Sequence, residues 1–536
     1  MPRLARLALP LAAATALLLA PPAFAAKGFS LGVTAGDVTA TSAILWGKAN
    51  RRGEYVLQVN DRRRFGNPDV ERLVRARPGN DNTVQAEIEK LDPDTRYFFR
   101  FTGPRGRRSD VGVFTTAPPP NARATVEFAW TGDTDFLPAP GESRPFWNNG
   151  GVFRRMRAER NDFNVHLGDT MYSDTEVPGP NDTPAAPTAV TVPQKWAKYR
   201  LNLGNRHLRA VRRTAGFYSH WDDHEFINDF SPAEATFANP ISGISENISG
   251  RTLYRRGARA FVDYAPVTYS RRDGLYRTVR WGRNLELFFL DERSFRSAKA
   301  DEGGVCNNPD TGSPDFAPTA PQERRNFFGA VIPSLRQPVS QACLDAIRSP
   351  DRTFLGRRQL NRFIRDVEDS TARFKVVMNE MPIQQYYILP YDRWEGYEAE
   401  RQEILRQLRD VKNVVFLTTD VHATLVNDAR FQTLEPGGPQ DSGILDVTAG
   451  SAATANLALE IDDVTGQGSG ALADNFFLEP PPPNGVGMDC SVVDQFGYGQ
   501  VRVTSRRMTI TPKGMDGRPQ RSDDGPCGPF VLRYER

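Results

Sequence analysis

From Thr125 onward, short apolar runs alternate with amphipathic stretches, and this alternation restricts the fold more than any other feature of the sequence. Strands that alternate with helices favour an α/β layered domain. The expected strands are Val126–Trp130, Phe163–Leu167, Phe217–Trp221, Leu285–Leu290, Lys375–Met378 and Val414–Leu417. The expected helices are Pro145–Arg160, Leu253–Tyr264, Gly356–Ala372 and Glu395–Leu408. After Asp441 the pattern becomes mostly β, with Val501–Thr511 as the clearest strand.

Residues 27–118 have a different pattern, in which short β-rich runs are separated by turn-rich stretches. This pattern predicts a small β-sandwich. The segment Leu91–Arg100 resembles the fibronectin type III pattern, in which a tyrosine, here Tyr97, leads into a strand and hydrogen-bonds back to the chain. We assign no chemistry to this domain, and Ala117–Pro120 is the expected linker to the next one.

The first 25 residues have the pattern of an export signal. Arg3 and Arg6 precede the apolar run Leu7–Ala20, and Ala23–Ala25 supplies the small residues of a cleavage site. We therefore expect a periplasmic or secreted protein. In an oxidising compartment, four cysteines predict two structural disulfides, most simply Cys306–Cys343 and Cys490–Cys527.

Acidic residues and histidines follow each of the six expected strands. The segments are Gly132–Asp135, Gly168–Asp174, Asp222–Glu225, Asp291–Arg296, Asn379–Pro382 and Thr419–Ala423. In open α/β sheets, ligands bind beyond the carboxyl ends of the strands. So many carboxylates at one edge would repel one another, and bound cations would relieve that repulsion.

Histidines are scarce, and their positions sharpen this prediction. His166 and His220 are interpreted as supports of their strands, and His207 as a surface residue, since it lies in a basic run. His224 and His422 each have carboxylates within two residues, which favours a role in the site.

The order Asp-x-Asp, Gly-Asp-x-x-Tyr, Asp-Asp-His-Glu and Asp-x-His resembles the calcineurin-like metallophosphoesterases. Within them, the segments His166–Tyr172, Trp221–Glu225, Leu290–Arg293 and Asp420–Ala423 resemble the alkaline phosphatase D (PhoD-like) family. The resemblance implies a four-layer β-sandwich flanked by helices over residues 122–536, preceded by the all-β domain. It also implies a hydrolase that acts on phosphate esters.

The resemblance further implies a role for individual residues. His224 stands at the position of the proton-donating histidine. Tyr172 stands where the family has a tyrosine that binds ferric iron as phenolate. The implied metal ligands are Asp133, Asp169 (bridging two metals), Tyr172, Asp223, Asp420 and His422.

Two or more metal ions are expected, and the resemblance implies Fe³⁺ and Ca²⁺. The family usually carries an iron-binding cysteine near the end of the first strand, but the stretch Phe128–Asp135 contains none. A first shell richer in oxygen favours harder cations, so zinc, manganese and magnesium stay open as well.

The expected substrates are small or polymeric phosphate mono- and diesters. A net charge of +3 indicates neither nucleic acid nor membrane as a dedicated partner. Arg293 or Arg296 could hold a phosphate oxygen, or could form an ion pair that supports Asp291. Asp135 and Glu380 have no assigned role, and the loop at residues 178–193, like those at 301–350 and 466–493, either frames the site or is a surface insertion.

Two alternatives stay open at the level of sequence. One is a phosphodiesterase specialised for nucleic acid, lipid or wall polymers, because the same metal chemistry serves both ester types. The other is an extracellular binding protein whose acidic cluster holds calcium without turnover. His224 and Tyr172 favour the enzyme, because structural calcium sites use oxygen ligands and little imidazole.

Overall fold

The computed structural model describes residues 28–239, 244–330, 332–435, 437–466, 468–470 and 485–535. The expected export signal at residues 1–25 lies outside these residues. None of the helices in the described ranges is long and apolar enough to cross a membrane.

The first part of the chain is all β, as predicted. One antiparallel sheet of this part has the order β4-β3-β6-β7. The hydroxyl of Tyr97 accepts a hydrogen bond from the backbone N–H of Asp92 at 2.9 Å, which is the predicted tyrosine corner. The strands of this sheet are β3 (Gly53–Asn60), β4 (Val70–Ala76), β6 (Arg96–Thr102) and β7 (Gly112–Thr115).

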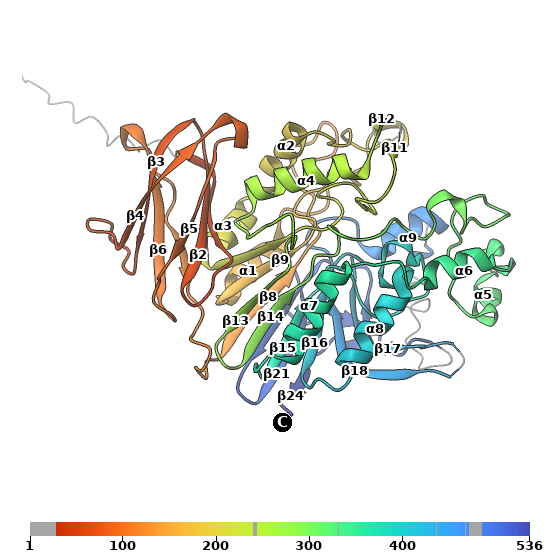
Figure 1. The fold of residues 1–536 in the computed structure, drawn as a ribbon. Helices are drawn as coiled ribbons and strands as arrows, with labels where there is room; N and C mark the ends of the chain where they lie inside the picture. The colour runs from red at the N-terminus through yellow and green to blue at the C-terminus, as the bar shows by residue number, and fades with distance from the viewer. Residues whose placement is uncertain are drawn as a thin grey trace, which may run out of the picture.

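A nine-stranded mixed sheet joins this first part to the rest of the molecule (Figure 1). Its order is β24-β21-β20-β8-β9-β10-β1-β2-β5, and β8, β9, β10 and β1 are parallel. Its strands are β1 (Phe29–Gly36), β2 (Ser42–Ala49), β5 (Thr83–Glu89), β8 (Val126–Thr131), β9 (Phe163–Leu167), β10 (Gly216–His220), β20 (Gly497–Val503), β21 (Arg507–Gly514) and β24 (Phe530–Arg533).

The second large sheet has seven strands in the order β13-β14-β15-β16-β18-β17-β19, with β14, β15, β16 and β18 parallel. Every residue of β9, β10, β15 and β16 is buried, which explains why these strands are rich in apolar and aromatic residues. The strands are β13 (Arg277–Trp281), β14 (Leu285–Phe289), β15 (Phe374–Met378), β16 (Val414–Thr418), β17 (Thr424–Phe431), β18 (Gln440–Thr448) and β19 (Met488–Val492).

The two large sheets pack face to face, and helices cover their outer faces, so the core has the four layers that the family resemblance implied. Phe128 and Val165 of the first sheet share one apolar cluster with Leu287 and Val376 of the second. The helices α1 (Gly151–Glu159), α2 (Val192–Leu203), α3 (Arg206–Thr214) and α4 (Gly250–Tyr264) lie on the first sheet, and α7 (Arg357–Glu368) and α8 (Glu398–Leu408) on the second.

Further short elements lie outside these layers. They are the ribbons β11 (Phe237–Asn239) with β12 (Ile244–Ile248) and β22 (Arg521–Ser522) with β23 (Gly525–Pro526), and the helices α5 (Gln322–Phe328), α6 (Gln341–Arg348) and α9 (Leu457–Thr465). Both predicted disulfides are present, Cys306–Cys343 and Cys490–Cys527.

Two element predictions were wrong in detail. The single strand expected at Val501–Thr511 is a hairpin of β20 and β21, because the hydroxyl of Thr504 accepts hydrogen bonds from the backbone of Arg506 and Arg507 and turns the chain. The helix expected from Pro145 begins only at Gly151, where the side chain of Asn148 accepts the N–H groups of Gly150 and Gly151.

Candidate metal and phosphate site

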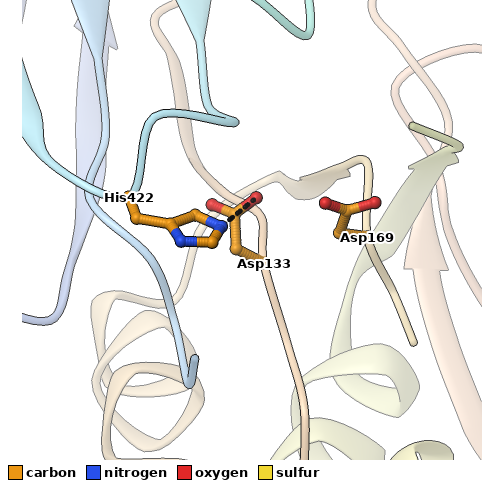
Figure 2. Close-up of side chains that lie close together, drawn as sticks. All are labelled: Asp133, Asp169 and His422. Carbon is orange, nitrogen blue, oxygen red and sulfur yellow. Dashed lines mark ion pairs between the residues drawn. The ribbon is translucent and has the colours of Figure 1, made fainter. Parts of the chain in front are cut away.

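The candidate site lies where strands of the two large sheets end on the same side. Asp133 follows β8, Asp169 follows β9, Asp223 and His224 follow β10, and His422 follows β16 after Asp420. Figure 2 shows Asp133 and Asp169 close to His422. The two aspartates follow strands of the nine-stranded sheet, whereas His422 follows a strand of the seven-stranded sheet. The topology therefore brings together residues that are far apart in the sequence.

The backbone at these residues has an uncommon conformation. The φ angles are 56° at Asp133, 50° at Asp169, 67° at Asp420 and 53° at His422. A positive φ is rare for residues other than glycine and costs free energy, and such residues cluster at functional sites. The fold thus holds four of the predicted ligands in strained conformations beyond the strand ends.

The predicted ligands form overlapping groups whose side-chain atoms lie within 4.8 Å of one another. Asp169 belongs to two groups, one with Asp133 and His422 and one with Asp223 and His224. Asp223 also forms a group with Asp222 and Asp420. A carboxylate shared between two groups is in a position to bridge two cations, which is the role expected for Asp169.

The hydrogen bonding of Asp133 shows that these residues fit a cation. Its side chain is 1% exposed, and neither carboxylate oxygen has a hydrogen-bond partner. Burial raises the pKa of Asp133 to about 7, although His422 acts in the opposite direction. Buried carboxylates are normally paired, so oxygens without a donor match the needs of a metal ion.

Tyr172 and His224 are in contact with these groups. The Tyr172 hydroxyl and His422 Nε2 share a hydrogen bond of 2.8 Å. The ring of Tyr172 stacks on that of His224, with centroids 3.9 Å apart. Tyr172 therefore contacts both His224 and His422, which belong to different groups.

The environment of His224 favours its charged form. Its Nδ1 lies 2.8 Å from Asp174 Oδ1. Burial acts to lower the pKa of His224, but the carboxylates of Asp174, Asp223 and Asp169 outweigh it and raise the pKa well above its ordinary value. A histidine that keeps its proton is suited to general-acid chemistry.

Glu225 connects two of the loops that carry ligands. Its carboxylate accepts the backbone N–H groups of Asp169, Thr170 and Asp222 at 2.8–3.0 Å. Because these donors follow β9 and β10, one side chain fixes the relative position of both strand ends. This explains why glutamate belongs to the Asp-Asp-His-Glu segment.

Arg293 and Arg296 are buried, and carboxylates contact their guanidinium groups, while Nη2 of Arg293 and Nη1 of Arg296 have no hydrogen-bond partner among the described residues. Arg293 contacts Asp222 Oδ1 at 2.5 Å and Asp392 Oδ2 at 2.9 Å. Arg296 contacts Asp392 Oδ1 at 2.9 Å and lies over the rings of Phe354 and Tyr397. The Arg293 side chain does not pair with Asp291, which only accepts its backbone N–H at 3.2 Å.

Three other residues discussed at the level of sequence, Glu380, His166 and Asp135, contact neighbouring buried side chains. Glu380 Oε1 is 2.7 Å from His220 Nδ1, and both side chains are fully buried. His166 Nε2 lies 2.9 Å from the hydroxyl of Thr134 and so supports the end of β8. Asp135 accepts hydrogen bonds from the hydroxyl of Thr175 and from the backbone N–H of Leu137.

Sequence reasoning missed three acidic residues of the site. Glu176 and Glu460 form a group with His422, and Asp392 forms one with Asp223 and Asp229. Glu176 lies close behind Asp174, so its acidic neighbourhood was a usable signal. Glu460 lies on α9 and Asp392 in a short 3-10 helix at Pro390–Asp392, and no strand end marks either of them.

A cavity of about 880 Å³ opens onto the acidic residues. Asp169, Asp223, His224, Asp420 and His422 line one part of it. This volume is in the range of small-molecule binding sites.

Comparison with known proteins shows what the chain is similar to. The sequence profile described as PhoD-like phosphatase matches residues 143–511, and that of the PhoD-like phosphatase N-terminal domain matches residues 12–118. Alkaline phosphatase D of Bacillus subtilis (strain 168) is 24% identical over 442 residues. The aligned region covers 76% of this chain and 66% of that protein, so the chain spans about two thirds of the length of this curated relative.

Two solved structures share the fold. The structure of PhoD has a TM-score of 0.68 and 20% identity, and the match covers 96% of this chain and 90% of that one. Purple acid phosphatase PPD1 from yellow lupin (Lupinus luteus) seeds has a TM-score of 0.52 and 10% identity, with 91% and 72% covered. The chain therefore shares the fold of PhoD and of this purple acid phosphatase. Since the family profile matches well over half of its residues, the chain belongs to the PhoD-like phosphatase family.

Proposed function

We propose that this chain is a metal-dependent phosphoesterase that hydrolyses phosphate mono- or diesters. The observation that carries the proposal is the set of overlapping buried acidic groups that share Asp169 and Asp223. Two or more cations would be held by Asp133, Asp169, Tyr172, Asp223, Asp420 and His422. Fe³⁺ and Ca²⁺ are the first candidates by family, and the oxygen-rich donor set equally suits Mn²⁺ or Mg²⁺. Bound cations would activate a water and neutralise charge on the phosphate.

His224 is the proposed general acid. Its protonated ring would donate a proton to the oxygen of the leaving alcohol, which could contribute about 10²–10⁴-fold to the rate. Asp174 would hold the ring through Nδ1, which leaves Nε2 for the substrate. The stacked ring of Tyr172 limits rotation of the imidazole.

The two buried arginines have a positioning role in this proposal. Their guanidinium groups lie against Asp222 and Asp392 rather than among the described residues that line the cavity. Arg293 would thus fix the acidic loop after β10 instead of gripping phosphate. Glu380 would act in the same way through His220.

We also infer export from the cytoplasm, which the two disulfides support because such bonds persist in oxidising compartments. The proposed division of the chain is an all-β domain at residues 27–118 and a catalytic domain at residues 122–536. The proposed partners are phosphate esters, small or polymeric, without a dedicated nucleic-acid or membrane partner.

The test begins with the full mature chain purified without chelators and its metals quantified. Aryl phosphate mono- and diesters are then assayed before and after metal removal, together with His224→Ala and Asp169→Asn. We expect metal-dependent turnover that falls by at least about 10²-fold in both variants. His207→Ala, on the outer helix α3, and Asp523→Asn, at an exposed position, are the matched controls.

The ratio of monoester to diester turnover separates a phosphatase from a specialised phosphodiesterase. A folded protein that binds metal but turns over neither substrate would contradict the enzyme and support a metal-stabilised binding protein.

A further inference from the structure

The cavity beside the acidic groups has a second part whose chemistry the phosphate site does not require. We call this part the apolar wall, and it consists of hydrocarbon side chains from three separate segments of the chain. Its residues are Phe316, Phe327, Ile332, Ile388, Leu389 and Ile461. The same cavity therefore offers acidic residues for cations at one part and a hydrocarbon surface at another.

A disulfide and a buried ion pair hold the segment that supplies half of the apolar wall. Three of its residues come from the insertion at residues 301–350, which the disulfide Cys306–Cys343 closes. Inside this insertion, the buried side chain of Arg325 pairs with Asp315 at 2.6 Å and also donates to the carbonyl of Ala317.

The insertion is also fixed to the segment at residues 388–392. The backbone N–H of Leu389 donates to the carbonyl of Phe316 at 2.7 Å, and the Tyr391 hydroxyl donates to the carbonyl of Asp315 at 2.8 Å. The wall is thus held in place before any ligand arrives, which reduces the entropy that binding would cost.

Two residues of the wall expose a large part of their surface. The side chain of Phe327 is 69% exposed and that of Leu389 is 40% exposed. Leu389 also has a φ angle of 41°, a left-handed conformation that disfavours leucine. Exposed apolar surface next to a cavity marks a ligand-binding site, and strained backbone is common at such sites.

We propose that the cavity binds phosphate esters whose alcohol part is an extended aliphatic chain. The phosphate would lie at the acidic groups with their cations, and the chain would lie along the apolar wall. This inference rests on the proposed function and names its substrate class.

The chemistry of the wall favours an aliphatic group over a sugar or a nucleoside. Hydroxyl groups or base edges placed against these six side chains would lose water without replacement, although Ser313 and Arg393 also line the cavity. A hydrocarbon chain loses nothing polar and gains free energy with each buried methylene. Because Phe327 and Leu389 are exposed, the hydrocarbon surface continues out of the cavity, and a chain longer than the cavity can still be accommodated.

The test is calorimetric titration of the metal-loaded full chain with methylphosphonate, octylphosphonate and phenylphosphonate, none of which is hydrolysed. We expect octylphosphonate to bind at least about tenfold more tightly than methylphosphonate, because seven further carbons contact the wall. Phenylphosphonate should fall closer to methylphosphonate than to octylphosphonate.

Two variants locate the effect. Leu389→Asn removes the hydrocarbon, while asparagine tolerates the left-handed backbone, so the fold is retained. Ile332→Ser removes a second part of the wall. Each should reduce the octyl-to-methyl affinity ratio at least about threefold. Leu73→Asn, at a 63% exposed leucine of β4 far along the chain, is the matched control and should leave the ratio unchanged.

Equal affinities for octyl- and methylphosphonate would overturn the inference and leave the proposed function standing. Tight binding of phenylphosphonate, equal to that of octylphosphonate, would overturn the aliphatic assignment. An octyl preference that survives both wall variants would overturn the location. Binding of none of the three would overturn the inference together with the phosphate site on which it rests.

Discussion

The hydroxyl of Tyr172 and Nε2 of His422 are 2.8 Å apart, although 250 positions separate them in the sequence. Tyr172 follows β9 of the nine-stranded sheet and His422 follows β16 of the seven-stranded sheet. The ring of Tyr172 also stacks on His224. One tyrosine thus connects a candidate ligand of one sheet with the proposed acid beyond the other.

Removing the Tyr172 hydroxyl should weaken metal binding without unfolding the site. Tyr172→Phe keeps the stacked ring, so we expect metal affinity to fall at least about tenfold while the protein stays folded. When loaded with ferric iron, the wild type should show a visible absorption band from the phenolate, and the variant should lack it. Metal titration and visible spectroscopy check both points, with the buried Tyr199→Phe as control. A band that persists in Tyr172→Phe would remove this residue from the ligand set.

Asp174 is expected to position His224 and to set its pKa. Asp174→Asn should lower kcat about 10–100-fold with metal content unchanged. An acid works only while protonated, so activity falls as pH rises through the pKa of His224. Because the Asp174 carboxylate raises that pKa, the variant should lose activity at lower pH than the wild type. A pH–rate profile of both proteins measures this. If activity is lost at the same alkaline pH in both, His224 is not the acid.

Arg293 should contribute more to stability than to phosphate affinity. Arg293→Met leaves Asp222 without its buried partner and Asp392 with Arg296 alone, and should lower the free energy of unfolding by about 3–5 kcal/mol. Denaturant unfolding at neutral pH gives this value, and inhibition by inorganic phosphate gives the affinity. A variant with normal stability but strongly weakened phosphate inhibition would instead support direct phosphate binding. Arg358→Met, at a 53% exposed side chain, is the control.

The buried carboxyl of Asp446 should make the free energy of unfolding depend on pH, separately from any effect of the candidate site. Its side chain is fully buried, and burial raises its pKa to about 7. Between the ordinary aspartate pKa and this value, the folded state binds more protons than the unfolded state, so stability falls as pH rises.

Asp446→Asn should remove this dependence. Relative to the variant, the wild type should lose about 1.4 kcal/mol per pH unit between pH 5 and pH 6.5. Thermal unfolding of both proteins across this range provides the measurement. Parallel curves for the two proteins would show that Asp446 ionises normally.

The sequence alone determined the central strands, the residues that follow them and the disulfide pairing. The strands could be predicted because β9, β10, β15 and β16 are buried on both faces and so are short stretches rich in apolar and aromatic residues. The candidate metal ligands could be predicted because they lie in the segments that directly follow these strands. The tyrosine corner at Tyr97 was also local, since its partner Asp92 lies only five positions earlier.

Only the tertiary structure decided which side chains complete the site. Glu460 reaches His422 from α9, and Asp392 reaches Arg293 from a short 3-10 helix, and neither position carries a local signal. The arginines after Leu290 pair with Asp222 and Asp392, and these ion pairs depend on distant segments meeting in space. The apolar wall depended in the same way on the insertion packing beside Leu389. Strand patterns follow from burial along a short stretch of chain, whereas these contacts arise only when distant segments pack together.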